Sequence, residues 1–231
     1  MIGIIVELLL SWLLLKYTLR KNLNVLQWNP YPRHWRYLLF GFVLPLVYLC
    51  LLYWGISLWV HNPYQLNTDY SLSKFWTASL FVLRAVAFEE LLFRGAILYV
   101  LIHWIGTNKA VILSALAFGV YHWFAYGLIG QPVQMLMVLF TTGAMGYVWA
   151  WALVRSGTIL LPFALHLGYN FTSMVIFSNE KNIGPQLLLK SYAVDPVKPE
   201  GILPLLMVLI YYIGFPMLCW FLIRLIKPNQ Q

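Results

Sequence analysis

Long apolar runs separated by short polar stretches make up most of this chain. Several runs reach the roughly 20 predominantly apolar residues that are needed to cross the hydrocarbon core of a bilayer. Four of them contain no Asp, Glu, Lys or Arg: Tyr37 to Val60, Val133 to Val154, Thr158 to Ser178 and Ile202 to Ile223. Three further candidates are shorter or carry polar residues: Ile2 to Tyr17, Phe75 to Ile105 and Ala110 to Gly127. The pattern predicts an all-α fold, a polytopic transmembrane bundle of about seven helices.

Composition agrees with a protein that resides in a membrane. Hydrophobic side chains make up 61% of the chain and charged ones only 10%, which lies outside the range of soluble globular domains. No linker or internal repeat divides the chain, and its longest polar stretches are too short to hold a folded domain. We therefore predict one integral-membrane domain over residues 1–231, which acts within the bilayer or at its edge.

The basic residues predict the orientation in the membrane. With seven helices, the larger set falls on one side: Lys16, Arg20, Lys21, Arg33, Arg36, Lys109, Arg155, Arg224 and Lys227. The smaller set falls on the other side, offset by acidic residues: Lys74, Lys181, Lys190 and Lys198. The positive-inside rule then predicts an amino terminus outside and a carboxyl terminus in the cytoplasm. Topology and contact with lipid headgroups account for the net charge of +8, so no nucleic-acid partner is predicted.

The first apolar segment is predicted to stay in the protein as a helix. It lacks the basic start and the small-residue cleavage site of a signal peptide, and it carries Glu7. These features argue against removal by a signal peptidase.

Charged residues interrupt the apolar run from Phe75 to Ile105. Glu89, Glu90 and Arg94 lie within it, where ionisable side chains are costly and normally face a protein interior or a water-filled cavity. Glu90 and Arg94 are four residues apart, so their side chains meet on one helix face, whereas Glu89 lies about 100° further round. We therefore expect Arg94 to neutralise Glu90 and to leave Glu89 available for chemistry.

Two histidines lie well inside other apolar segments. His122 follows Phe118 by four residues, and Asn170 follows His166 by the same interval, so each pair shares a helix face. The helical rise of about 1.5 Å per residue places His122 roughly 18 Å, His166 roughly 12 Å and Glu89 roughly 21 Å from the predicted cytoplasmic starts of their helices. All three depths fall in the central layer of a core about 30 Å thick. We expect these side chains to share one site.

Such a set of side chains is suited to hydrolysis. A carboxylate and an imidazole can together deprotonate a trapped water, and the hydroxide then attacks a carbonyl carbon. The second imidazole and the amide are suitable donors to the developing oxyanion. A zinc site is the alternative, with Glu89, His122 and His166 as ligands and the spare glutamate as base. The H-E-x-x-H signature of many zinc proteases is absent.

The motifs resemble those of a known family. Glu89-Glu90-x-x-x-Arg94, Phe118-x-x-x-His122 and His166-x-x-x-Asn170 follow one another on successive apolar segments. This order resembles the CAAX prenyl protease and bacteriocin-processing (CPBP) family of intramembrane endopeptidases, also called the Abi family. All three motifs match, and together they lie within residues 84–173.

The resemblance implies a glutamate-dependent protease of a type long classed as a metalloendopeptidase. By position, Glu89 would be the general base, assisted by His122, while His166 and Asn170 would hold the oxyanion. Glu90 and Arg94 would be the supporting pair, with Phe118 beside them. The resemblance favours a mechanism with no cofactor, and zinc remains the alternative.

The expected partners are membrane lipids and a membrane-associated peptide or protein substrate. Members of the family process prenylated peptides, pheromones, bacteriocin-related peptides or sorting signals, and the compact chain suggests a bacterial plasma membrane. The rival hypothesis is a non-catalytic membrane protein, a transporter or a bacteriocin-immunity scaffold, that binds its ligand in the same polar cavity. Transporters often contain repeats, and none is evident here.

Overall fold

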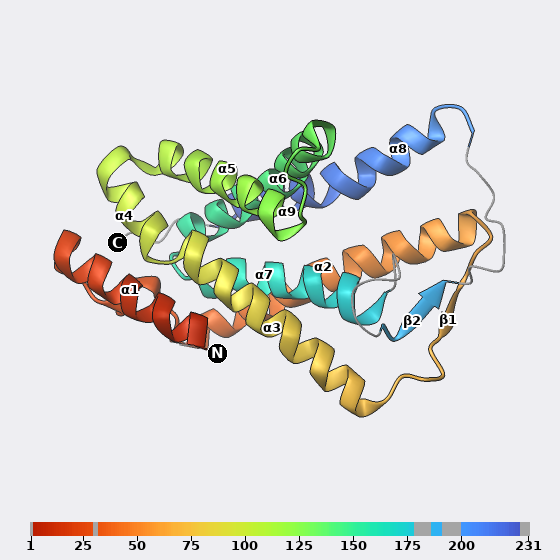
Figure 1. Ribbon diagram of the computed structural model, residues 1–231, viewed down its shortest axis with the longest axis horizontal. Coiled ribbons are helices and arrows are strands. Elements are labelled where there is room, and N and C mark those ends of the chain that lie inside the picture. Colours follow the sequence, from red (N-terminus) through yellow and green to blue (C-terminus); the bar gives the residue numbers. More distant parts are fainter. Residues whose placement is uncertain (1, 30–31, 178–185, 191–199, 227–231) are drawn as a thin grey trace.

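The protein is a bundle of helices that run roughly along one long axis (Figure 1). The computed structural model describes residues 2–29, 32–177, 186–190 and 200–226. The α-helices are α1 (Ile2–Leu19), α2 (Pro32–Trp59), α3 (Leu72–Arg94), α4 (Ala96–Ile105), α5 (Thr107–Ala125), α6 (Pro132–Ser156), α7 (Leu160–Phe171), α8 (Leu203–Leu209) and α9 (Phe215–Arg224). A 3₁₀ turn, η1 (Leu23–Leu26), follows α1, and π-helical turns η2 (Thr172–Ile176) and η3 (Ile210–Gly214) continue α7 and join α8 to α9. The prediction of an all-α transmembrane bundle is confirmed.

Four helices of the described part are long and apolar enough to cross a membrane. They are Ile2–Leu19, His34–Trp59, Pro132–Ser156 and Leu203–Arg224. The predicted span from Thr158 to Ser178 is shorter, because α7 and η2 cover only Leu160–Ile176. The predicted span from Phe75 to Ile105 is divided into α3 and α4. When α3 and α4 are counted together, the described residues form the seven helical segments that the sequence predicts.

Gly95 is where α3 ends and α4 begins. Its backbone leaves the helical conformation, with ψ at −139°, and a Cβ at this position would collide with the Leu91 carbonyl oxygen. Only glycine fits so close an approach. The break directs α4 away from the α3 axis immediately after Arg94, so Glu89, Glu90 and Arg94 occupy the last two turns of α3.

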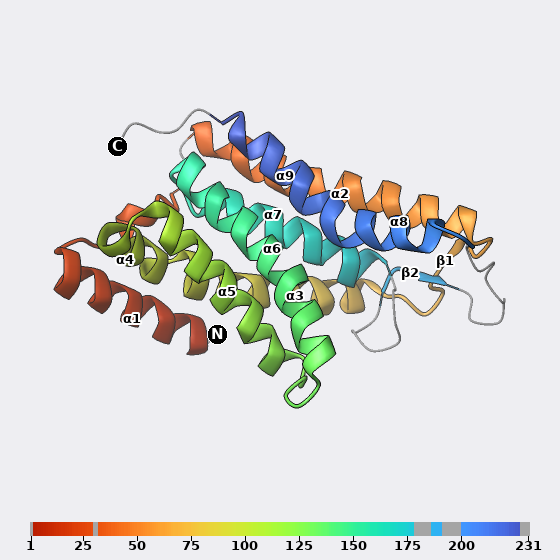
Figure 2. The same cartoon turned by 90° about the horizontal axis from the view of Figure 1, so that it is seen from above.

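Two helix pairs form the centre of the bundle, seen from above in Figure 2. Helix α6 packs along α5, and α7 packs along α2. The second contact is close because it uses small residues: a Cβ on Gly41 of α2 would lie 2.7 Å from the Ala164 Cβ of α7, and Gly168 of α7 abuts the α2 backbone. Small residues let helix backbones approach in this way. Helix α1 packs outside this centre, against α3 and α4.

The two ends of the bundle differ in what they carry. The end of α1, the start of α2, the α4–α5 and α6–α7 turns and the end of α9 gather at one end (Figure 1). The predicted basic loops lie at these junctions, although Lys227 lies outside the described residues, as do Lys181 and Lys198 of the smaller set. The other end carries a two-stranded antiparallel sheet, in which β1 (Tyr64–Leu66) pairs with β2 (Leu188–Lys190). We call the first end the basic end.

Candidate active site

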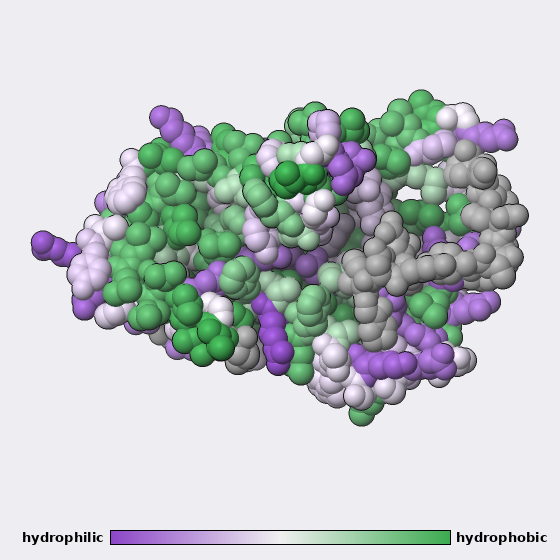
Figure 3. Space-filling view, viewed as in Figure 1, coloured by the Kyte–Doolittle hydropathy of each residue, from purple (hydrophilic) through white to green (hydrophobic). Residues whose placement is uncertain are grey.

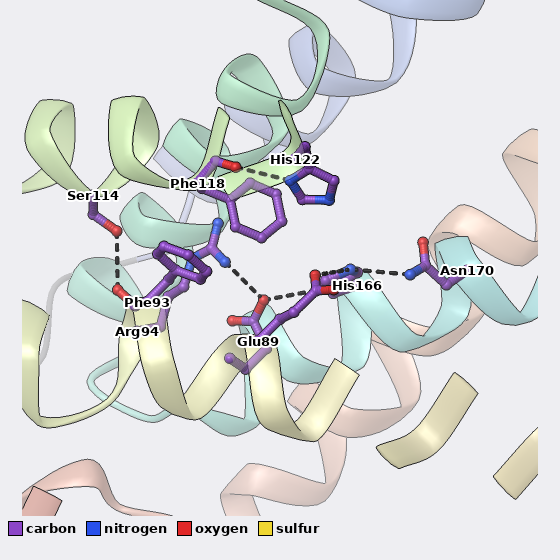
Figure 4. Close-up of polar contacts among 9 residues, drawn as sticks. Glu89, Phe93, Arg94, Ser114, Phe118, His122, His166 and Asn170 are labelled. Carbon is purple, nitrogen blue, oxygen red and sulfur yellow. Dashed lines mark hydrogen bonds and ion pairs between the residues drawn. The ribbon is translucent and has the colours of Figure 1, made fainter. Parts of the chain in front are cut away.

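The last turns of α3 contain a buried ion pair. Arg94 Nη1 lies 3.1 Å from Glu90 Oε1, and the two side chains are 0% and 1% exposed. The pairing expected from the four-residue spacing is therefore confirmed. Ser114 of α5 donates a hydrogen bond of 2.9 Å to the Phe93 carbonyl oxygen, which holds α5 against this part of α3 (Figure 4).

His166 on α7 connects the two adjacent glutamates. Its Nδ1 lies 2.8 Å from Glu90 Oε1, and its Nε2 lies 3.6 Å from Glu89 Oε2. Because the Arg94-paired carboxylate accepts, Nδ1 of His166 is the donor in the shorter contact. The Asn170 amide nitrogen lies 3.1 Å from Nε2 of the same ring (Figure 4). Helices α3 and α7 thus bring together five of the residues singled out from the sequence: Glu89, Glu90, Arg94, His166 and Asn170.

His122 on α5 is held by its own helix. Its Nδ1 lies 2.8 Å from the Phe118 carbonyl oxygen. A carbonyl oxygen only accepts, so the ring carries its hydrogen on Nδ1 and leaves Nε2 free as a base or a ligand. The Phe118 ring stands edge-on to His122, with centroids 4.5 Å apart, and to His166, at 5.9 Å. Phe118 therefore fixes one histidine through its carbonyl and touches both through its ring.

Helix α6 supplies a part of the site that the sequence did not reveal. Trp149 stacks on the His166 ring, with centroids 4.0 Å apart and planes 18° apart. The Arg94 guanidinium lies 4.2 Å from the Phe118 ring centroid and 5.3 Å from that of Trp149. Gly146 leaves room for it, because a Cβ there would lie 3.1 Å from Arg94 Nη2. The only sequence signal is that Gly146 and Trp149 are three residues apart, on one helix face.

A cavity of about 460 Å³ lies beside these residues. His122, His166 and Asn170 line it, together with residues of α6 from Gln134 to Trp149 and with Tyr211 and Tyr212 of η3. Its walls therefore come from α5, α6, α7 and η3. Figure 3 shows hydrophilic side chains recessed near the middle of a face that is otherwise largely hydrophobic. We call this space the main cavity.

Glu89 lines a different and smaller cavity. That cavity, of about 230 Å³, lies between α1, α3 and α5, and we call it the α1 cavity. No hydrogen bond joins Glu89 to His122 among the described residues. The expectation of one shared pocket therefore holds for His122, His166 and Asn170, while Glu89 reaches the group through its contact with His166.

The three proposed zinc ligands are not gathered around one point in the described arrangement. Among the residues that the structure describes, no three His, Cys, Asp or Glu side chains are gathered as metal ligands. Both ring nitrogens of His166 already have partners, Glu90 on Nδ1 and Asn170 on Nε2. The proposed set of Glu89, His122 and His166 would have to rearrange before a metal ion could bind it.

Comparison with known proteins adds the family. Residues 71–172 match the family described as type II CAAX prenyl endopeptidase Rce1-like. Over this segment, the chain is similar to the CAAX protease family, in agreement with the resemblance of its motifs. No curated protein and no solved structure matches the chain. The family match supports an intramembrane endopeptidase of the CAAX-protease type as the general activity.

The matched residues contain the cluster of buried polar side chains described above. They run from the start of α3 into the first residue of η2, and thus include all three motifs and the Trp149 wall. Helices α1, α2, α8 and α9 lie outside the match.

Proposed function

We propose that this protein is an endopeptidase that hydrolyses a peptide bond of a membrane-associated peptide or protein. Glu89 is the general base, His122 assists it in activating the water, and His166 with Asn170 stabilises the oxyanion. The observation that carries the proposal is the position of His166. It contacts both carboxylates of α3 while it faces the main cavity beside Asn170.

The hydrogen-bond pattern gives each imidazole a separate task. His122 keeps its proton on Nδ1, so its unpaired Nε2 faces the cavity as an acceptor for a proton of the water. His166 donates from Nδ1 to Glu90. A proton that reaches its Nε2 makes this atom a donor to the carbonyl oxygen of the substrate. The Asn170 amide, 3.1 Å away, supplies the second donor.

The buried pair of Glu90 and Arg94 supports this arrangement. Arg94 compensates the charge of Glu90, which in turn orients the His166 ring. Phe118 and Trp149 pack around the guanidinium and the ring. These residues act through His166 and need no contact with the substrate.

The proposal includes a location and an orientation. The protein lies in a bacterial plasma membrane, with its basic end in the cytoplasm, so the amino terminus is outside. Positive-inside bias supports this orientation, and protease protection of tags at the two termini in sealed vesicles tests it. A tag at the carboxyl terminus that is cleaved from outside would reverse the assignment.

The decisive experiment compares Glu89→Ala and His122→Ala with the control Glu200→Ala. Glu200 is exposed and lies outside the site. The secreted and membrane peptides of cells that carry each variant are analysed by mass spectrometry for new termini. We expect the control and the unsubstituted protein to produce the same termini, and the two site variants to produce none while remaining inserted and folded. Retained cleavage by purified Glu89→Ala protein would refute the proposal, and binding without any product would favour a transporter or an immunity scaffold.

The mechanism is proposed to need no metal ion, and zinc is the alternative. Exhaustive chelation followed by elemental analysis and a cleavage assay distinguishes them. Activity that survives with no zinc in the sample supports the first mechanism, and activity that is lost and then restored by added zinc supports the second.

A further inference from the structure

Peptide hydrolysis needs two reactants, and Glu89 lies between two cavities. Its Oε2 lies 3.6 Å from His166 Nε2, at the wall of the main cavity. Glu89 is also one of the residues that line the α1 cavity, on another side of α3. A peptide that occupies the main cavity displaces water from it, so the base needs water from elsewhere.

The α1 cavity has the size and the polar groups to hold water. Its volume of about 230 Å³ corresponds to several water molecules at about 30 Å³ each. Glu89, Arg84 and Tyr121 line it and provide the polar partners that an internal water requires. Glu89 Oε2, the oxygen 3.6 Å from His166 Nε2, is buried and has no hydrogen-bond partner within the described part of the chain, so this carboxylate is not yet satisfied.

Helix α1 contributes a second unsatisfied carboxylate next to this space. Gly3 and Ile4 of α1 line the α1 cavity, and Glu7 follows them by four and three residues, on the same helix face. Both carboxylate oxygens of Glu7 are buried without a hydrogen-bond partner among residues 2–29, 32–177, 186–190 and 200–226. Buried acceptors of this kind are normally satisfied, often by ordered water.

The cavity lies far from the basic end. Gly3 lies about 20 Å along the helix axis from Lys16, which is in the basic last turn of α1. This distance covers most of a hydrocarbon core about 30 Å thick. The first turn of α1 is therefore close to the opposite membrane surface. Arg84, whose side chain is exposed, can extend its guanidinium towards that surface.

We infer that the α1 cavity admits the hydrolytic water to Glu89 from the opposite side to the bound peptide, with the first turn of α1 as its outer wall. This inference rests on the proposed function, because it concerns water for the same base. It assigns a role to α1, which lies outside the segment that matches the family.

Cysteine labelling tests whether water reaches the cavity, independently of catalysis. Ala85 lines the α1 cavity, whereas Leu83, 39% exposed, lies about 200° away on the same helix. Ala85→Cys and Leu83→Cys are made in protein without its two native cysteines and treated with a charged, water-soluble methanethiosulfonate. We expect Ala85→Cys to react much faster, because only a hydrated thiol ionises, and Ile4→Trp to slow its reaction. Equal rates for the two cysteines overturn the inference, whether or not the protein is a protease.

Kinetics tests whether the water is used. Ile4→Trp fills the cavity, whereas the neighbouring Ile5 is 63% exposed, so Ile5→Trp adds the same bulk outside it. We expect Ile4→Trp to lower kcat about tenfold or more with KM unchanged, because the nucleophile is misplaced, and Ile5→Trp to behave as the unsubstituted protein. Gly3→Leu is the second filling variant, since a Cβ there meets the Phe88 ring at an ordinary 3.5 Å. Unchanged kcat in both folded filling variants, or an equal loss in Ile5→Trp, overturns the inference.

Discussion

Adjacent glutamates in the same helix are expected to respond to substitution in opposite ways. Glu90→Gln preserves the shape of the side chain but removes its charge, so the fully buried guanidinium of Arg94 loses its counterion. Removing one partner of a buried ion pair costs about 3–5 kcal/mol. For a chain of this length, that corresponds to a fall in Tm of roughly 6–20 °C. Glu89→Gln should leave Tm almost unchanged, because the Glu89 side chain is 15% exposed and its Oε2 has no hydrogen-bond partner among the described residues.

Activity should show the reverse order. Loss of a general base lowers kcat by about 10²–10⁴-fold, so folded Glu89→Gln protein should be nearly inactive. Both quantities can be measured on the same detergent-purified samples, Tm by thermal unfolding and kcat by cleavage of a peptide whose scissile bond has been mapped by mass spectrometry. The double variant Glu90→Gln with Arg94→Met is the matched control, since removal of both charges restores much of the lost stability.

The reasoning would be refuted by equal Tm losses in the two glutamine variants. It would also be refuted if Glu89→Gln remained active, or if the double variant were no more stable than Glu90→Gln alone. The first result would mean that both carboxylates are structural, and the second that another group is the base.

Three further predictions concern the walls of the site. Asn170→Ala should lower kcat about 10²–10³-fold with little change in KM, as expected for an oxyanion donor. A decrease of kcat of less than tenfold in a steady-state assay would contradict that role. Trp149→Leu removes the ring that stacks on the imidazole of His166. It should lower kcat about two- to tenfold, the equivalent of a stacking energy of about 0.5–1.5 kcal/mol, whereas Trp149→Phe should keep most of the activity. An equal loss of kcat in both variants would mean that the volume of the side chain, and not its stacking, matters. Gly146→Ala overpacks the guanidinium pocket and should cost about 1–3 kcal/mol in thermal unfolding, whereas Gly143→Ala, whose Cβ would meet one backbone oxygen at 3.5 Å, should cost far less.

Local spacing and segment depth explain why part of the site could be predicted from the sequence. The four-residue interval between Glu90 and Arg94 fixes their contact on any regular helix, and the same holds for His166 and Asn170. Comparable depths in separate apolar runs correctly indicated that α3 and α7 would bring their polar residues together. The all-α fold followed from the apolar runs themselves.

Features that depend on contacts between helices could not be predicted in this way. The sequence does not distinguish Trp149 from ten other tryptophans, because its role arises from the rotation of α6 towards α7. The sequence does not distinguish Gly95 from other glycines in apolar runs. Only the structure shows that a Cβ at this position would collide with the Leu91 carbonyl oxygen. The separation of Glu89 from the main cavity depends on where α1 packs, and no motif marks that position.

Two walls of the main cavity differ in how deeply they are buried. Helix α7 is fixed to α2 by close glycine contacts, whereas α8 and η3 contain no buried residue. Substitution of Tyr212, which is 40% exposed and lines the main cavity, therefore changes the shape of this space at little cost to folding.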